Sequence, residues 1–318
     1  MIMEYLKGLI LSTAIILPAT AVSQTNNDYW HVDTDVYMEL EEYRGQRDSF
    51  DNKVFDKTSM VGKLSLTNPS SLWSFHLEHR ESLRNYGRNF STSRDSYIRN
   101  RTQIGATRQL YRSTDAVLSL NGTYRKESND SAHNTLSRSS NSLYWLMPAG
   151  SFAFNKKWSF DFWDAFYYYS NFLKSNNYEW EAEHGVTYKY SDTITAKLTL
   201  YSDRVWDKDF KNIFSQDQIR VYLPIKLSDQ WEISPYFRYF LNESSYDQRK
   251  HLTQKVKNGY RIGTQVAYKL TPKLTLWGGA AIEPTQWKYP KDDDMTSGTN
   301  NRQTFYLGQI GFKYSWQW

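Results

Sequence analysis

The chain has 318 residues, a formal net charge of +5 and no cysteine. The lack of cysteine excludes a disulfide framework, thiol catalysis and thiolate metal sites. Aromatic residues make up 17% of the chain, with 25 Tyr and 12 Trp, although 23% of its residues are charged. A high share of aromatic residues in an otherwise polar chain is typical of a membrane β-barrel, whose wall faces lipid outside and water inside.

The first 23 residues have the order of a secretory signal peptide. Lys7 precedes an apolar run over residues 8–17, and Pro18 and several small residues follow. We expect cleavage after Ser23, with Ala21 as the alternative. A membrane anchor is the less favoured reading, because the run is shorter than the ~20 residues that a spanning helix needs. The sequence therefore predicts a signal peptide over residues 1–23 and one β-barrel domain over residues 24–318.

Short runs of alternating polar and apolar residues follow the signal peptide. Between Trp30 and Leu40 every second residue is nearly always apolar, and the residues between them, from His31 to Glu41, are mostly charged or polar. A period of two indicates a strand with one apolar face and one wet face. The pattern returns over residues 60–67, 73–80, 118–125, 179–187, 194–200, 218–226 and 261–269, and is least regular over residues 98–110.

The connections between these runs alternate in length. Short polar turns are predicted near residues 68, 113–115, 155–157, 191–192, 228–229 and 271–272. Longer polar stretches lie between them, for example over residues 85–94, 128–139, 242–255 and 290–302. This layout predicts an all-β, transmembrane, antiparallel up-and-down barrel of about fourteen strands, with both chain ends on the periplasmic side.

The C-terminal run suits the last strand of a closed barrel. Backbone polar groups in lipid have no water to bond, so the last strand is expected to pair with the first. Phe312, Tyr314, Trp316 and Trp318 alternate with polar residues, similar to the assembly signal of bacterial outer-membrane proteins. A soluble sandwich or lipocalin-like barrel is the alternative. It would need an apolar interior, whereas here the second face carries many Arg and Glu.

The laid-out strands resemble the outer membrane porin G (OmpG) family. Residues 215–225, Ser-Gln-Asp-Gln-Ile-Arg-Val-Tyr-Leu-Pro-Ile, are similar to a family strand, and residues 234–238, Ser-Pro-Tyr-Phe-Arg, to the strand after it. Further similar pieces are residues 28–31, 147–148, 260–263 and 308–316. The resemblance implies a fourteen-stranded monomeric porin in the bacterial outer membrane, in contact with lipid and lipopolysaccharide, and without a cofactor.

Charged residues recur on the wet face of these strands, where a lumen would be. A fourteen-strand barrel is too wide for side chains to fill, so a water-filled lumen is expected. Charges there would tune ion selectivity, and unlike charges facing each other would set up a transverse field. The alternative is that they only solvate the wall through ion pairs. The predicted pore-lining residues are Arg80, Arg99, Arg101, Arg125, Arg220, Arg238, Arg261, Glu39, Glu41, Glu78, Glu179, Glu181, Glu183, Glu283, Tyr222 and Trp277.

Aromatic residues also occupy positions of the alternating pattern that are expected to face inward. Besides Tyr222 and Trp277, these are Tyr37, Tyr201 and Phe305. They either stack against sugar rings or only narrow the lumen, and the second reading is favoured. The predicted function is therefore passive diffusion of ions, sugars and other small hydrophilic solutes. A substrate-selective oligosaccharide channel is the alternative. Basic aromatic chains can also bind nucleic acid, but the export signal and the alternation favour a pore without a nucleic-acid partner.

An outer-membrane enzyme is a further rival. His76 and His79 lie near Glu78, Ser74 and Ser82, but the two histidines fall on opposite faces of their strand, and no Gly-x-Ser-x-Gly sequence occurs. No enzyme and no metal site are therefore expected.

The resemblance also implies loop gating by pH through a histidine pair. The matching positions here are Lys257 and Tyr306. Histidine is the side chain whose ordinary titration falls between pH 5 and 8, so we expect this chain to lack the family's gate.

Overall fold

The computed structural model describes residues 29–45, 56–68, 70–85, 97–131, 139–171, 176–247, 252–288 and 301–317. The predicted signal peptide lies outside these residues. No helix long and apolar enough to cross a membrane occurs among them. The strands are β1 His31–Gly45, β2 Asp56–Thr67, β3 Trp73–Asn85, β4 Tyr97–Arg112, β5 Ala116–Ser131, β6 Ser139–Ala153, β7 Trp158–Asn171, β8 Asn177–Lys189, β9 Thr195–Trp206, β10 Asn212–Tyr222, β11 Ile225–Lys226, β12 Trp231–Asp247, β13 Leu252–Lys269, β14 Leu274–Lys288 and β15 Asn301–Gln317.

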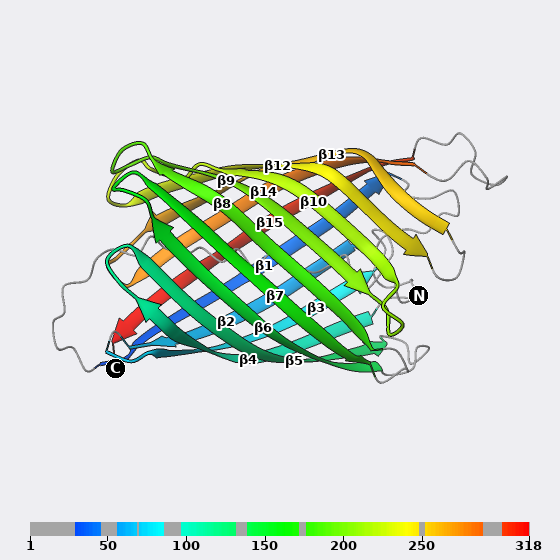
Figure 1. Cartoon of the computed structure of the whole chain (residues 1–318), viewed down its shortest axis with the longest axis horizontal. Coiled ribbons are helices and arrows are strands. Elements are labelled where there is room, and N and C mark those ends of the chain that lie inside the picture. Colours follow the sequence, from blue (N-terminus) through cyan, green and yellow to red (C-terminus); the bar gives the residue numbers. More distant parts are fainter. Residues whose placement is uncertain are drawn as a thin grey trace.

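The strands form one closed antiparallel barrel (Figure 1). Apart from β10 and β11, each strand pairs with its neighbours in the chain, β1 pairs with β15, and β10 pairs with β12. The two-residue β11 continues the line of β10 along β12, so β10 and β11 act as one strand. The barrel therefore has fourteen strands around its circumference, which confirms the predicted fold class and strand count.

Proline explains the break between β10 and β11. Pro224 has no backbone N–H to give to the ladder, and the ladder stops at Tyr222 and resumes at Ile225. The neighbouring Leu223 still donates its N–H to the carbonyl of Pro235, at 3.0 Å. Pro224 thus lies at a strand end, whereas Pro235 lies inside β12, facing the break.

The first and last strands close the barrel. The register of β1 and β15 runs from His31 opposite Gln317 to Gly45 opposite Gln303. The start of β1 and the end of β15 therefore lie at the same end of the barrel (Figure 1). Tyr314 pairs with Thr34 within this seam. The predicted pairing of the terminal strands is confirmed, and Trp318 lies outside the described residues.

The short turns lie where the sequence predicts them, and lysine–aspartate pairs hold two of them. Lys189 contacts Asp192 at 2.6 Å, and Lys226 contacts Asp229 at 2.7 Å. The hydrogen bond from the lysine holds the pKa of each exposed aspartate below its usual range.

The long polar stretches are shorter than predicted, because strands extend into them. β5 continues to Ser131, β12 to Asp247, and β13 begins at Leu252. The prediction that these residues are loops was therefore wrong for the ends of the stretches. Alternation disappears where both faces of a strand are polar, so the strand ends carry no period-two signal.

The outer surface of the barrel is apolar. Large side chains stand exposed along its length, including Leu40, Ile104, Leu200 and Ile310, the last of which is 68% exposed. Their neighbours in sequence point the other way, because successive side chains of a strand alternate between its faces. A polar inside and an apolar outside reverse the arrangement of a soluble barrel and fit a wall in lipid.

Two belts of aromatic rings flank this apolar surface. Near the short turns, Trp158 packs against Tyr188 at 4.5 Å and Trp231 packs against Tyr268 at 4.6 Å between ring centroids. Nearer the other end, Tyr178 stacks on Phe210 at 4.7 Å and Phe237 lies 6.2 Å from Tyr260.

The spacing of the belts matches a membrane. On β8 the belt residues Tyr178 and Tyr188 are ten residues apart, and on β13 Tyr260 and Tyr268 are eight apart. At about 3.4 Å per residue and a tilt of about 40°, these intervals span roughly 20–26 Å. The apolar band of outer-membrane barrels is about 25 Å tall.

Candidate pore-lining surface

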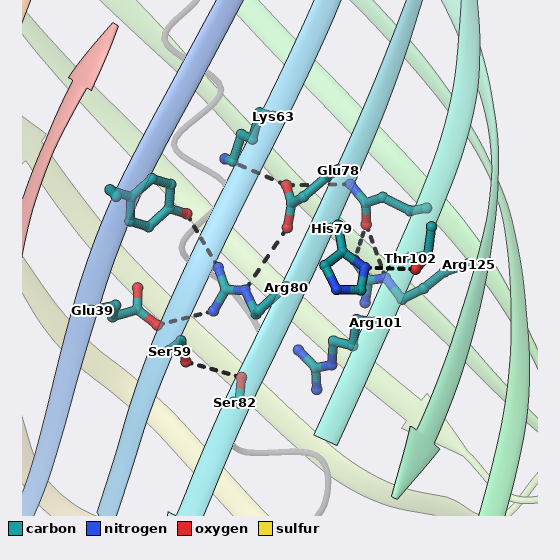
Figure 2. Close-up of polar contacts among 12 residues, drawn as sticks. Glu39, Ser59, Lys63, Glu78, His79, Arg80, Ser82, Arg101, Thr102 and Arg125 are labelled. Carbon is teal, nitrogen blue, oxygen red and sulfur yellow. Dashed lines mark hydrogen bonds and ion pairs between the residues drawn. The ribbon is translucent and has the colours of Figure 1, made fainter. Parts of the chain in front are cut away.

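All sixteen predicted pore-lining residues lie on strands and are buried or half-buried. Along each strand they alternate with the exposed apolar side chains, so they lie on the inward face. Figure 2 shows Arg80 between Glu39 and Glu78, with Arg101 and Arg125 on the strands beyond. The charges are organised into networks, which determine what the inner wall presents to a solute.

Arg80 on β3 is the hub of the first network (Figure 2). Its Nη1 donates to Glu39 Oε1 at 2.9 Å, and its Nη2 donates to the hydroxyl of Tyr37 at 3.2 Å. Lys57 on β2 lies 3.0 Å from the same Glu39 oxygen and also contacts Glu41. Two carboxylates of β1 are thereby held against one cation of β2 and one of β3.

Glu78 extends this network toward β5. Its Oε1 lies 3.8 Å from Arg80 Nε, and its Oε2 lies 3.5 Å from Lys63 Nζ. Gln103 on β4 donates to Glu78 at 3.5 Å and accepts two hydrogen bonds from Arg125 at 2.9 and 2.7 Å. One polar chain therefore crosses five adjacent strands.

Arginines dominate the wall at β4 and β5. Arg101 Nε lies 2.8 Å from Glu127 Oε1, and Arg125 Nη1 lies 3.8 Å from the same oxygen. Arg99 donates to Asn129 Oδ1 at 2.8 Å. This part of the wall is basic, because the described guanidinium groups outnumber the carboxylate that they share.

Tyrosines hold the acidic wall at β8. Glu181 accepts hydrogen bonds from Tyr167 at 3.0 Å and from Tyr201 at 2.7 Å. Glu179 accepts one from Tyr169. These carboxyl groups lie on the same face of one strand, and tyrosine hydroxyls donate the hydrogen bonds described here.

A second row of arginines crosses β10, β12 and β13. Arg220, Arg238 and Arg261 stand directly opposite one another in the registers of these strands. Arg220 Nη1 contacts Glu183 at 2.8 Å, and Arg261 Nε contacts Glu283 at 2.6 Å. Arg238, between them, forms no ion pair within the described part of the chain.

The two basic walls face each other across the lumen. The row on β10, β12 and β13 is centred seven strands away from β4, half-way around the fourteen. Ion pairs such as Arg261 with Glu283 join neighbouring strands, and others, such as Glu183 with Arg220, reach across one intervening strand. Unlike charges therefore pair along the wall, and the expected transverse field across the lumen stays a prediction.

Aromatic rings fill the wall at the seam of the barrel. Tyr37, Gly311 and Trp277 stand opposite one another on β1, β15 and β14. The two rings pack at 5.1 Å between centroids over the glycine, which has no side chain to separate them. Trp277 also donates its Nε1–H to Asp35 at 2.9 Å. Both rings are buried in this part of the wall.

The remaining predicted inward aromatics also lie in contact with charges or other rings. Arg220 lies over the ring of Tyr201, 3.3 Å from its centroid, and Arg261 over that of Phe305 at 4.8 Å. Tyr222 is half-buried and its ring lies 6.4 Å from that of Tyr236. Two of these rings thus already hold a guanidinium group on one face.

The residues considered for catalysis take separate partners. His76 contacts Thr123 at 3.2 Å, whereas His79 contacts Thr102 at 2.8 Å. Ser82 bonds to Ser59 at 2.9 Å (Figure 2). No group of three His, Asp or Glu side chains suited to a metal ion occurs in the described ranges.

Several inward residues were missed by sequence reasoning. They are Lys57, Arg84, Glu127, Trp145, Tyr167, Tyr169, Asp203 and Glu243. Lys57 and Arg84 lie close to strand ends, where the period-two signal is weak. Continuing the inward and outward alternation of each strand by two to four residues would have identified them as inward.

The positions that match the family's histidine pair face outward. Lys257 is exposed and falls in a register shift between β13 and β14, so it has no partner residue there. The ring of Tyr306 lies 5.1 Å below the guanidinium of Arg44. His251 lies outside the described residues.

Comparisons with known proteins point to one family. The family model described as outer membrane protein G (OmpG) matches residues 27–314. Outer membrane porin G of Escherichia coli (strain K12) is 25% identical over 163 residues, which are 49% of this chain and 50% of that protein. The match thus spans about half the length of this relative.

Solved structures share the fold at low identity. The CymD monoaromatic hydrocarbon channel has a TM-score of 0.53 at 7% identity, with 91% of this chain and 89% of that one covered. CdiB from Escherichia coli has a TM-score of 0.50 at 9% identity, with 93% and 64% covered. Both likenesses concern the barrel alone.

Proposed function

Because the chain belongs to the outer membrane protein G (OmpG) family, we propose that it is an outer-membrane porin. In this proposal small hydrophilic solutes, ions and sugars diffuse passively through its lumen. Family membership favours a channel over an enzyme. The observation that carries the proposal is the closed fourteen-strand barrel with an apolar outside and a charged inside.

The sixteen predicted residues line the proposed path. Charged and hydroxyl groups on the inner wall replace part of the hydration of a polar solute, whereas a fatty molecule gains nothing there. Ion pairs such as Arg261 with Glu283 keep long side chains against the wall and so leave room along the axis.

Liposome swelling with sugars of rising size tests this function. A general pore gives rates that fall smoothly with solute size to a cutoff. A dedicated oligosaccharide channel would pass some long oligosaccharides faster than short controls, and that result would replace the general-diffusion proposal. Liposomes that do not swell with any sugar would contradict both.

We further propose that the functional unit is a monomer surrounded by lipid and lipopolysaccharide. The ring closes within one chain, through β1 with β15 and β10 with β12, so no second copy is needed to complete the wall. Molar mass in detergent, measured by light scattering, is expected to correspond to one chain. A stable dimer or trimer would contradict this.

A further inference from the structure

Guanidinium groups gather on the inward face of β3, β4 and β5. Ser82 stands between Arg80 and Arg84 on β3, and directly opposite Arg99 on β4. Its small side chain bonds to Ser59 on the neighbouring strand. The arginine cluster near Ser82 consists of Arg84, Arg99, Arg101 and Arg125.

The cluster has donors that no protein group uses. Arg84 Nε, Arg101 Nη2 and Arg125 Nη1 are buried and have no hydrogen-bond partner among the described residues. Arg101 is 7% exposed and Arg84 is 5% exposed. Buried polar groups are normally paired, so unused guanidinium donors on three adjacent strands indicate a missing acceptor.

Charge points to the same missing acceptor. Arg101 and Arg125 share the carboxylate of Glu127. Arg84 itself stacks over the ring of Tyr97 at 6.0 Å and forms no ion pair there. The neighbouring network around Arg80 is neutralised by its own carboxylates, so it does not cancel this surplus.

We propose that the arginine cluster binds the carboxylate or phosphate group of an anionic hydrophilic solute inside the lumen. Arginine presents its donors in a planar fork that matches both groups. This inference rests on the proposed porin function, since the solute reaches the cluster through the open lumen. It adds a preference to that function, because a bare size filter has no subsite for anions.

Three solutes with one common ring test the proposal. Glucose, glucuronate and glucose 6-phosphate are added in turn to single channels of the full mature chain in a planar bilayer. We expect the two anions to block the current reversibly at concentrations at which glucose does not. Block by one anion alone would assign the site to that group, carboxylate or phosphate. Anions that block no better than glucose would overturn the proposal.

Two single variants locate the site. Arg84→Gln and Arg101→Gln are each expected to weaken the anion block by about tenfold, since each removes charge-assisted hydrogen bonds. Arg84→Gln removes no ion pair of the described chain, so it is expected to fold. The matched control is Arg108→Gln, which removes the same charge from an exposed side chain that lies over Trp73. Unchanged block in both lumenal variants would overturn the assignment.

Charge-conserving variants distinguish the contribution of arginine's bidentate geometry from that of its positive charge. Arg84→Lys and Arg101→Lys keep the positive potential but lose the bidentate geometry. We expect them to retain the reversal potential of the wild type in a KCl gradient while the anion block weakens. Open-channel conductance without added solute tests the porin function independently, so an open channel that anions fail to block would overturn the subsite alone.

Discussion

At the scale of single residues, the lumenal ion pairs have two effects. They satisfy charges that would otherwise stand unpaired in a partly desolvated wall, and they fix which charges remain available to a solute. The pair of Glu183 and Arg220 is one of the best defined, at 2.8 Å, with the guanidinium also resting on Tyr201.

A double-mutant cycle on this pair measures its contribution. Glu183→Gln is expected to lower the free energy of unfolding by about 1–3 kcal/mol, because Arg220 loses a charged hydrogen bond and stays against the wall. The double variant with Arg220→Gln is expected to cost less than the sum of the single variants, with a coupling of about 0.5–3 kcal/mol. Urea unfolding in detergent provides the values, and strictly additive effects would show that the pair is not coupled.

The absence of a histidine pair gives a prediction about pH. Lys257 and Tyr306 occupy the matching positions, so neither position carries the side chain that ordinarily changes charge between pH 5 and 8. The channel is expected to stay open over this range in planar-bilayer recordings. Closure on acidification would show that another group, in a part of the chain outside these positions, gates the pore.

Which residues face inward followed from parity, but their partners did not. Alternation identifies Glu39 and Arg80 as inward residues without saying that they meet, since they lie 41 positions apart. The register that brings them together is a property of strand pairing. The same limit applies to the other lumenal charges, whose pairing along the wall also depends on this register.

At the scale of the strand, a glycine shapes the seam. Tyr37 and Trp277 pack over Gly311, and a Cβ built on this glycine would collide with the Cβ of Tyr37 and the carbonyl oxygen of Val36. The backbone carbonyl has little freedom to move, so the ring pair would have to shift.

Gly311→Ala is therefore expected to destabilise the barrel by about 1–3 kcal/mol through overpacking. Gly308→Ala is the matched control on the same strand, because nothing lies within 4 Å of a Cβ at that position. The midpoint of denaturant unfolding checks both variants. Equal stability of the two would contradict the packing role of Gly311.

The existence of the strands could be predicted better than their lengths. Period-two alternation appears where one face meets lipid and the other water, as on β9 or β14. It vanishes beyond the aromatic belts, where both faces are wet, so the last residues of β5 and β12 read as loop. The break at Pro224 was foreseeable because proline lacks a ladder donor, while the continuous path of β12 through Pro235 depends on the neighbouring break.

At the scale of the whole molecule, closure decides both fold and proposed function. A sheet with an apolar outer face has unpaired edges unless its first and last strands meet, and the register of β1 with β15 completes the ring. Closure could be predicted from this requirement together with the aromatic C-terminal strand. The arrangement of two basic walls facing each other could not, since it depends on the order of fourteen strands around the ring.

The most direct test of the proposed porin is its single-channel conductance. The mature chain, refolded in detergent and inserted into a planar bilayer in concentrated KCl, is expected to give discrete steps of large, stable conductance. Each step corresponds to one chain, because the ring of strands closes within the chain. Insertion without any conductance, by a chain shown to be folded by its strand content, would contradict the water-filled lumen on which the proposed function depends.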